Sequence, residues 1–152
     1  MASPEEKLAE LGVELPEAPA PAAAYVPFAR TGSLVLTAGQ LPVVDGKLEV
    51  TGKLGAGVDL ETGQRLARQA AINILAQAKA AAGDLGFVRV VKLTCFVASD
   101  PSFTEQHLVA NGASEFLGEV LGDNGVHARS AVGVPVLPLD APVEIEAILE
   151  LG

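Results

Sequence analysis

The segment ARSAVGVPVLPLDAPVEIEAILEL, residues 128–151, contains two apolar stretches separated by a proline-containing turn. The first stretch runs from Arg129 to Val134, and Arg129 is its only charged side chain. The second stretch runs from Val143 to Leu151, with apolar side chains at every other position. Such alternation is typical of a strand with one buried face. The segment therefore predicts two strands joined around Pro135 to Asp140, where prolines interrupt regular structure.

The two faces of the last strand differ in character. Three acids on one strand face are typical of a surface that water covers. The alternative is that one acid lies in a pocket beside Arg129 and orients a water molecule. The acidic face would consist of Glu144, Glu146 and Glu150 with Ile148, and the apolar face of Val143, Ile145, Ala147 and Leu149.

Arg129 has two interpretations of its own. Because its strand carries no competing charge, its planar guanidinium is available to bind a carboxylate through two hydrogen bonds. The alternative is an ordinary surface ion pair.

The segment before these strands predicts helices and one further strand. Asp59 is a suitable N-cap for a helix from Leu60 to about Ala82, which Gly83 would end. A second helix is expected from about Ser102 to Leu121. The strand between them, Val88 to Ala98, would bury the side chains of Val91, Leu93, Cys95 and Val97, with Cys95 as a small apolar core residue.

The first third of the chain predicts two paired strands and a peripheral helix. Strands are expected at Tyr25 to Ala29 and Ser33 to Gln40, joined around Thr31 and Gly32, and a short edge strand at Leu48 to Val50 after an Asp45-Gly46 turn. Ser3, Pro4 and Glu6 form a capping-box pattern for a short helix. The prolines between Pro16 and Ala24 predict an extended connector.

These elements predict one α+β domain over residues 1–152, with residues 1–24 as an N-terminal helix and connector. Two main helices would cover one face of a mainly antiparallel sheet. The chain is 49% hydrophobic and only 19% charged, which is more apolar than an ordinary soluble domain. The other sheet face therefore predicts packing against copies of the same chain.

Several classes of function are disfavoured by composition. The net charge of −9, without a basic cluster, argues against nucleic acid and anionic membranes as partners. No apolar run reaches the ~18 residues of a membrane span, and the first residues do not resemble a signal peptide, so a cytoplasmic protein is expected. His107 and His127 lack the spacing of metal ligands, and nucleotide and serine-hydrolase motifs are missing, so neither metal nor cofactor is expected.

The motifs from Tyr25 onward resemble the RidA/YjgF family. Its C-terminal signature is matched by Ala128-Arg129-Ser130, Leu137-Pro138 and the residues from Val143 to Ile148. Its first strand is matched by Leu36 to Pro42, with Tyr25 at the corresponding distance before Gly39. The resemblance implies a chorismate-mutase-like fold and a homotrimer whose sheets form a central barrel, with ligand clefts between subunits.

The resemblance also implies a site and a reaction. Arg129 would bind the carboxylate of a 2-imino acid, Glu144 would position the attacking water, Gly39 would supply backbone contacts and Tyr25 would close the pocket. Asn111 would line the cleft, although the preceding segment is about one helical turn longer than in the family. The reaction would be cofactor-free hydrolysis of 2-enamine or 2-imino acids to 2-oxo acids and ammonia.

Two departures from the family pattern affect the expected substrate. Ala131 stands where deaminases of the family have a cysteine, and Ala38 stands where they have a serine, so the cleft loses two polar contacts. His127 stands where the family often has proline and, together with the N-terminal extension and the longer helix, it indicates a divergent subgroup whose natural substrate is expected to differ. The alternative function is a non-catalytic trimer that binds small carboxylates in the same cleft. A ribonuclease or translation-inhibitor role, which older family names carry, is disfavoured by the acidic charge balance.

Overall fold

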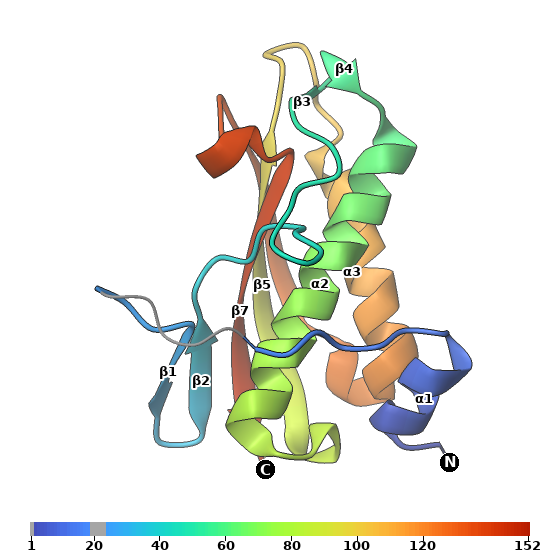
Figure 1. Ribbon diagram of the computed structural model, residues 1–152, viewed down its shortest axis with the longest axis vertical. Coiled ribbons are helices and arrows are strands. Elements are labelled where there is room, and N and C mark those ends of the chain that lie inside the picture. The colour runs from blue at the N-terminus through green and yellow to red at the C-terminus, as the bar shows by residue number, and fades with distance from the viewer. Residues whose placement is uncertain (1, 19–23) are drawn as a thin grey trace.

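The computed structural model describes residues 2–18 and 24–152, arranged as a sheet with two long helices on one side (Figure 1). The helices are α1 (Pro4–Glu10), α2 (Leu60–Ala82) and α3 (Gln106–Leu121), with 3-10 turns η1 (Leu85–Phe87), η2 (Gly122–Gly125) and η3 (Pro138–Asp140). The strands are β1 (Phe28–Thr31), β2 (Leu34–Thr37), β3 (Lys53–Leu54), β4 (Gly57–Val58), β5 (Val88–Ala98), β6 (Ala128–Val134) and β7 (Val143–Leu151).

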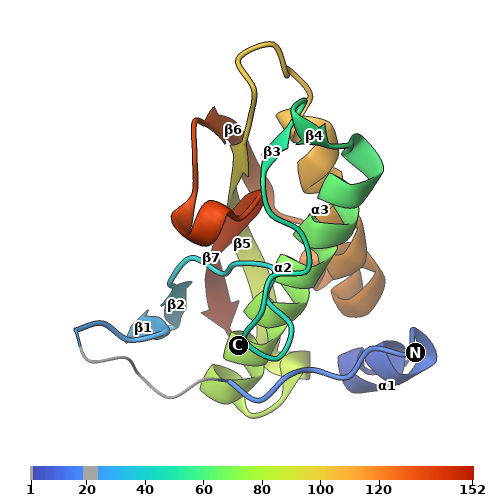
Figure 2. The same ribbon diagram turned by 45° about the horizontal axis from the view of Figure 1, so that its top comes forward.

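The main sheet has five strands in the order β1-β2-β7-β5-β6. All neighbours are antiparallel except β5 and β6, which are parallel because α3 connects them. Both long helices lie on the same face of this sheet, as a second view confirms (Figure 2). The predicted α+β class with a mainly antiparallel sheet is therefore confirmed. No helix within the described ranges is long and apolar enough to cross a membrane.

The core lies between the sheet and the two helices. In α2 the stripe of Leu66, Ala70, Ile74 and Ala78, which repeats at helical spacing, is buried. From the sheet, the core receives the fully buried side chains of Val35, Leu93, Cys95, Ile145 and Leu149. Removing one such leucine or isoleucine side chain from water contributes about 1.5–3 kcal/mol to folding. This face of the sheet is called the covered face below.

The predicted bounds of α2 are confirmed, and local contacts explain them. The Asp59 side chain accepts a hydrogen bond of 2.8 Å from the backbone N–H of Thr62, which satisfies one of the free donors of the first turn. Gly83 ends the helix with a φ of 80°, a conformation that side-chain-bearing residues rarely adopt.

The predicted burial of Val91 in β5 is wrong. A β-bulge between Val90 and Lys92 shifts the pairing with β7, so Val88 and Val90 face the core and Val91 does not. An extra residue in one strand of a pair reverses which face the following side chains occupy. Leu93, Cys95 and Val97 then face the core as expected.

α3 begins later than predicted, at Gln106 and not near Ser102. The Asp100 side chain accepts hydrogen bonds from the backbone N–H and the hydroxyl of Ser102, and its carbonyl accepts one from the N–H of Phe103. These bonds form a turn that competes with the first turn of a helix. Phe103 consequently packs against the core from a loop.

The N-terminal hairpin is confirmed, but its strands are shorter than predicted. β1 and β2 pair from Phe28 with Thr37 to Thr31 with Leu34. Gln40 belongs to no strand but forms an isolated bridge with Ile145. The predicted edge strand at Leu48 to Val50 is wrong, because that segment is irregular and pairs with no strand of the main sheet.

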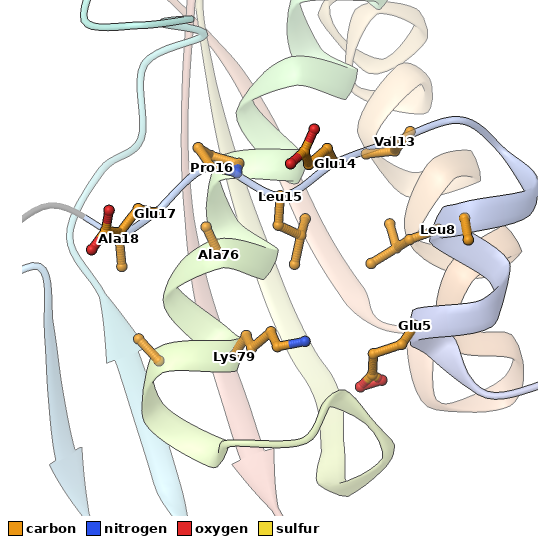
Figure 3. Close-up of a pocket in the computed structure, with 12 residues that line it drawn as sticks. Glu5, Leu8, Val13, Glu14, Leu15, Pro16, Glu17, Ala18, Ala76 and Lys79 are labelled. Carbon is orange, nitrogen blue, oxygen red and sulfur yellow. The ribbon is translucent and has the colours of Figure 1, made fainter.

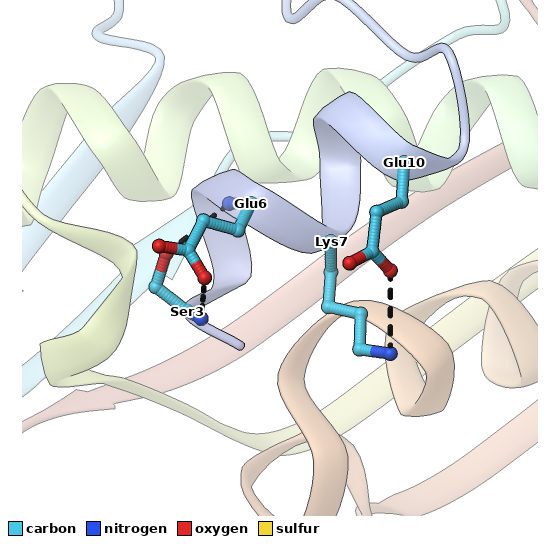
Figure 4. A network of polar contacts seen from close by, with 4 residues as sticks. All are labelled: Ser3, Glu6, Lys7 and Glu10. Carbon is cyan, nitrogen blue, oxygen red and sulfur yellow. Dashed lines mark hydrogen bonds and ion pairs between the residues drawn. The ribbon is translucent and has the colours of Figure 1, made fainter. Parts of the chain in front are cut away.

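The predicted capping box of α1 is confirmed (Figure 4). The Ser3 hydroxyl accepts a hydrogen bond of 3.1 Å from the Glu6 N–H, and the Glu6 carboxylate accepts one of 3.2 Å from the Ser3 N–H. Lys7 and Glu10 form an exposed ion pair on the same helix. Of the predicted connector, residues 19–23 lie outside the described residues.

The opposite side of the sheet, called the open face below, is not covered by any described part of the chain. Strand register places Leu36 opposite Ile148, and Phe96 opposite Val132. Leu36 and Val132 are 41% and 42% exposed, although both lie within strands. An apolar sheet face left open in this way is typical of a surface that another subunit covers.

Candidate functional site

Arg129 lies at the border between the covered face and the sheet edge. β6 is an edge strand, and its Arg129 is paired directly with Leu93 of β5. Residues paired across two strands point to the same face, and Leu93 is in the core. The Arg129 side chain therefore extends along the covered side, toward α3.

The Arg129 guanidinium is held by three neutral acceptors of α3. Nη1 donates to Asn111 Oδ1 at 2.9 Å and to Ser114 Oγ at 3.1 Å, and Nη2 donates to the His107 carbonyl at 3.2 Å. Among the described residues no carboxylate lies within ion-pair distance of it, so the alternative of a surface ion pair is not what the structure shows. A guanidinium has five N–H groups, and these three bonds leave two for an anion.

Ser114 and His127 extend this cluster, and neither was predicted as a site residue. His127 Nε2 lies 2.9 Å from Ser114 Oγ, and His127 Nδ1 lies 2.6 Å from the Gly125 carbonyl oxygen. Ser114 follows Asn111 by three residues, which places both on one side of α3. This three-residue spacing from Asn111 is the sequence feature from which Ser114 could have been predicted.

Ala131 lies on the same face as Arg129, two residues further along β6. It is paired with Cys95 and packs against the core. Burial raises the pKa of the Cys95 thiol to about 12, with a smaller opposing effect from the positive charge of Arg129. Cys95 is therefore an inert core thiol beside the cluster.

Glu144 lies on the open face, together with Gly39. Its partner in β5 is Phe96, an odd number of residues from Leu93, so Glu144 points away from the core. A Cβ atom at position 39 would overlap the Glu144 carboxylate, so the missing side chain of Gly39 makes room for it. Partial burial raises the pKa of Glu144, and the negative charge of Glu146 raises it further.

The predicted site residues thus form two groups within one chain. Arg129 and Asn111 are in contact on the covered side, whereas Glu144 and Gly39 are in contact on the open face. β5 separates the two groups, since it lies between β6 and β7. Tyr25 precedes β1, at the sheet edge opposite β6, and is 65% exposed.

A sizeable pocket of the single chain lies elsewhere (Figure 3). Its volume is about 500 Å³, and it is lined by residues of α1, the connector and α2. Leu8 and Leu15 point into it, and Glu5 and Lys79 lie at one end. None of the predicted site residues lines it, so this pocket is not the predicted cleft.

No metal site was found within residues 2–18 and 24–152, where no three His, Cys, Asp or Glu side chains form a group suited to an ion. The polar groups suited to chemistry are the donors of Arg129 on the covered side and the carboxylate of Glu144 on the open face. The first suit a carboxylate, and the second suits activation of a water molecule.

Comparison with known proteins identifies the family. The family described as "YjgF/chorismate_mutase-like, putative endoribonuclease" matches residues 5–151. The chain is 49% identical to Protein TCP17 of Trypanosoma cruzi over 147 residues, which cover 95% of this chain and 92% of that protein.

Solved structures show the same relationship. The crystal structure of Atu1372, a protein with unknown function from Agrobacterium tumefaciens, has a TM-score of 0.91 and 53% identity, covering 98% of this chain and 92% of that one. The structure of E. coli TdcF with bound serine has a TM-score of 0.64 and 29% identity, covering 90% and 94% of the two chains. The chain therefore belongs to the YjgF/RidA family.

Proposed function

We propose that this protein hydrolyses reactive 2-enamine and 2-imino acids to 2-oxo acids and ammonia, without a cofactor. The observation that carries the proposal is the state of Arg129. Its guanidinium is fixed by neutral acceptors of α3, meets no carboxylate among the described residues, and keeps two N–H groups for a ligand. Two donors in one plane are what a bidentate carboxylate requires.

The chemistry follows from placing the substrate carboxylate on Arg129. The neighbouring carbon of the C=N bond is then held in one position for attack by water. Glu144 accepts a proton from that water as the C–O bond forms, and passes it to the nitrogen to give a carbinolamine. Glu144 then accepts the hydroxyl proton of the carbinolamine and passes it to the nitrogen, so that the C=O bond forms, the C–N bond breaks and ammonia leaves. The raised pKa of Glu144 makes its ionised form a stronger base. Orientation supplies most of the acceleration, since an imine is already electrophilic.

The active cleft is proposed to lie between two chains of a homotrimer. Within one chain Arg129 and Glu144 lie on opposite faces of the sheet, so a single chain does not bring them together. The apolar open face supports its burial against a neighbour. Gly39 would then contact the ligand through its backbone, and Tyr25 would close the cleft.

Mixing two inactive variants tests this arrangement. Arg129→Ala and Glu144→Gln are each expected to be inactive, and are then co-refolded in equal amounts. If each site combines Arg129 of one chain with Glu144 of its neighbour, one half times one half, about a quarter of the sites, regain both groups. Recovery of ammonia release to that level supports the two-chain site. No recovery, with mixed trimers demonstrated by mass, contradicts it.

Arg129 itself is tested by substitution. Arg129→Ala should leave the assembly intact and reduce hydrolysis of freshly generated 2-iminopropionate by a factor of tens to thousands, because losing a desolvated charge-assisted pair costs on the order of 2–5 kcal/mol. Arg129→Lys should rescue poorly, since an ammonium lacks the planar fork. Hydrolysis by a folded Arg129→Ala variant at the parent rate would refute the proposal.

A second function is a non-catalytic carboxylate-binding protein. Ala131 and Ala38 replace two polar family residues, and the related TdcF structure contains bound serine. Binding of serine or pyruvate by calorimetry, with no ammonia released from any imino acid, would favour this alternative.

A further inference from the structure

We infer that Ser114 and His127 are positioning residues that hold the Arg129 guanidinium in its carboxylate-binding orientation. The inference rests on the proposed role of Arg129 as the carboxylate anchor. It assigns the direction of each hydrogen bond in the cluster, from Arg129 through Ser114 and His127 to the Gly125 carbonyl.

The His127 tautomer follows from its backbone partner. The Gly125 carbonyl oxygen, 2.6 Å from Nδ1, only accepts hydrogen bonds, so Nδ1 must carry the hydrogen. In the neutral imidazole Nε2 is then unprotonated and acts as an acceptor. The Ser114 hydroxyl, 2.9 Å from Nε2, must therefore donate its hydrogen to His127.

This direction determines what Ser114 presents to Arg129. A hydroxyl has one hydrogen, and His127 takes it. Only the lone pairs of Ser114 Oγ remain for Nη1 of Arg129, which donates across 3.1 Å. Asn111 Oδ1 accepts from the same nitrogen at 2.9 Å. Both hydrogens of Nη1 are thus occupied, and the guanidinium has little freedom to rotate.

The far end of the chain of bonds is fixed by packing. Gly125 is buried in η2, and a Cβ atom there would overlap the Leu117 carbonyl of α3. The Gly125 backbone therefore lies directly against α3, the same helix that carries Ser114 and Asn111. As a result, α3 fixes both ends of the network: the Gly125 end by backbone packing, and the Arg129 end through Ser114 and Asn111.

The inference predicts which substitutions weaken binding. Ser114→Ala removes one acceptor of Nη1. His127→Phe removes the acceptor of the Ser114 hydroxyl, whose hydrogen is then free to compete with Arg129 for Asn111 Oδ1. His127→Gln keeps a side-chain acceptor near Ser114 and should recover most of the lost affinity. Glu115→Ala, on the exposed side of α3, serves as the control.

The experiment measures KM and kcat for 2-iminopropionate and the Kd of pyruvate, after circular dichroism confirms folding. Ser114→Ala and His127→Phe should each raise KM and Kd about three- to tenfold, because the guanidinium is held less firmly but keeps its charge and its other contacts with α3. In these variants kcat should fall less than KM rises. His127→Gln should lie closer to the parent than His127→Phe does, and Glu115→Ala should match the parent.

Two results would overturn the inference, and both differ from failure of the proposed function. The first is an unchanged Kd for pyruvate in Ser114→Ala, while Arg129→Ala abolishes binding. The second is an equal effect of His127→Gln and His127→Phe. If the parent releases no ammonia, hydrolysis is refuted, but the pyruvate Kd series still decides the roles of Ser114 and His127.

Discussion

The two faces of the sheet are built from the same strands but are completed in different ways. In β7, Val143, Ile145 and Leu149 face α2 and α3 and are fully buried. The alternating residues, among them Glu144 and Ile148, face away from the helices and are only partly buried. The described part of the chain thus covers one face and leaves the other open. The comparison indicates that the covered face determines the fold; our proposal is that the open face determines assembly and, with it, the active cleft.

Substituting the adjacent β7 residues Leu149 and Ile148 tests this comparison directly. The change in the free energy of unfolding is the largest of the expected effects. Leu149→Ala should lower the free energy of unfolding by about 2–5 kcal/mol, because it leaves a cavity in a packed core. Ile148→Ala should have a much smaller effect on a single chain, because the side chain is already partly exposed. It should instead raise the concentration at which the assembly dissociates.

The measurements are urea unfolding at two protein concentrations and sedimentation. An equal loss of stability in both variants, independent of protein concentration, would mean that the two faces contribute alike to folding. The distinction between the two faces would then be lost.

A smaller effect is expected from Gly39→Ala on the open face. The added methyl group would overlap the Glu144 carboxylate, so that carboxylate must move. Displacing a catalytic group by about 1 Å costs as much as ~100-fold in rate, so imine hydrolysis should fall by roughly 10- to 100-fold. Gly118→Ala is the matched control, since a Cβ atom there meets open space. Parent activity in Gly39→Ala would exclude Glu144 from the reaction.

The smallest expected effect is a shift in the pH dependence of imine hydrolysis, which is set by the pKa of Glu144. Its pKa is raised by burial first and by Glu146 second. Hydrolysis requires the ionised form, so activity should rise with pH through the pKa of Glu144. Glu146→Gln removes the nearby negative charge, lowers that pKa, and should move the rise to lower pH. Glu150→Gln serves as the control, because Glu150 forms an ion pair with Arg89.

The raised pKa of Glu144 also affects the free energy of unfolding, in a direction that depends on pH. A carboxyl group that binds protons more tightly when folded contributes stability at low pH, and this is lost as pH rises through the folded pKa. Glu144→Gln should therefore remove a small destabilising contribution at neutral pH.

The pH-rate prediction has its own contradicting result. A rate profile that is identical in Glu146→Gln and the parent would contradict the assignment of Glu144 as the base.

Much of the fold was predictable because its determinants are local. The bounds of α2 depend on Asp59 and Gly83, and those of β5 and β7 on apolar alternation, so the sequence alone was sufficient. The β-bulge at Val90 depends on pairing with a distant strand, and its position was not predictable from one segment. The irregular course of residues 48–50 and the late start of α3 likewise depend on tertiary contacts and competing turns.

The candidate site was predictable in its residue types but not in its geometry. Arg129 was identified as an isolated charge, and the structure places its guanidinium in contact with Asn111. Their separation from Glu144 by the thickness of the sheet follows from the registers of β5 with β6 and with β7, which only the structure reveals. The contacts among Ser114, His127 and Gly125 join α3 to η2 and to the residue before β6. Sequence spacing alone therefore did not indicate them.

The position of β7 in the sheet has a consequence for how the chain folds during synthesis. β7 is the last strand in sequence, yet it lies between β2 and β5 and pairs with both. The Ala147 N–H bonds to the Thr37 hydroxyl across 110 residues of sequence. At roughly 5–20 residues per second, a ribosome completes β2 seconds before β7 exists. During that interval β2 and β5 each expose an unpaired edge, so the nascent chain depends on late, non-local closure, which is intrinsically slow and vulnerable to aggregation.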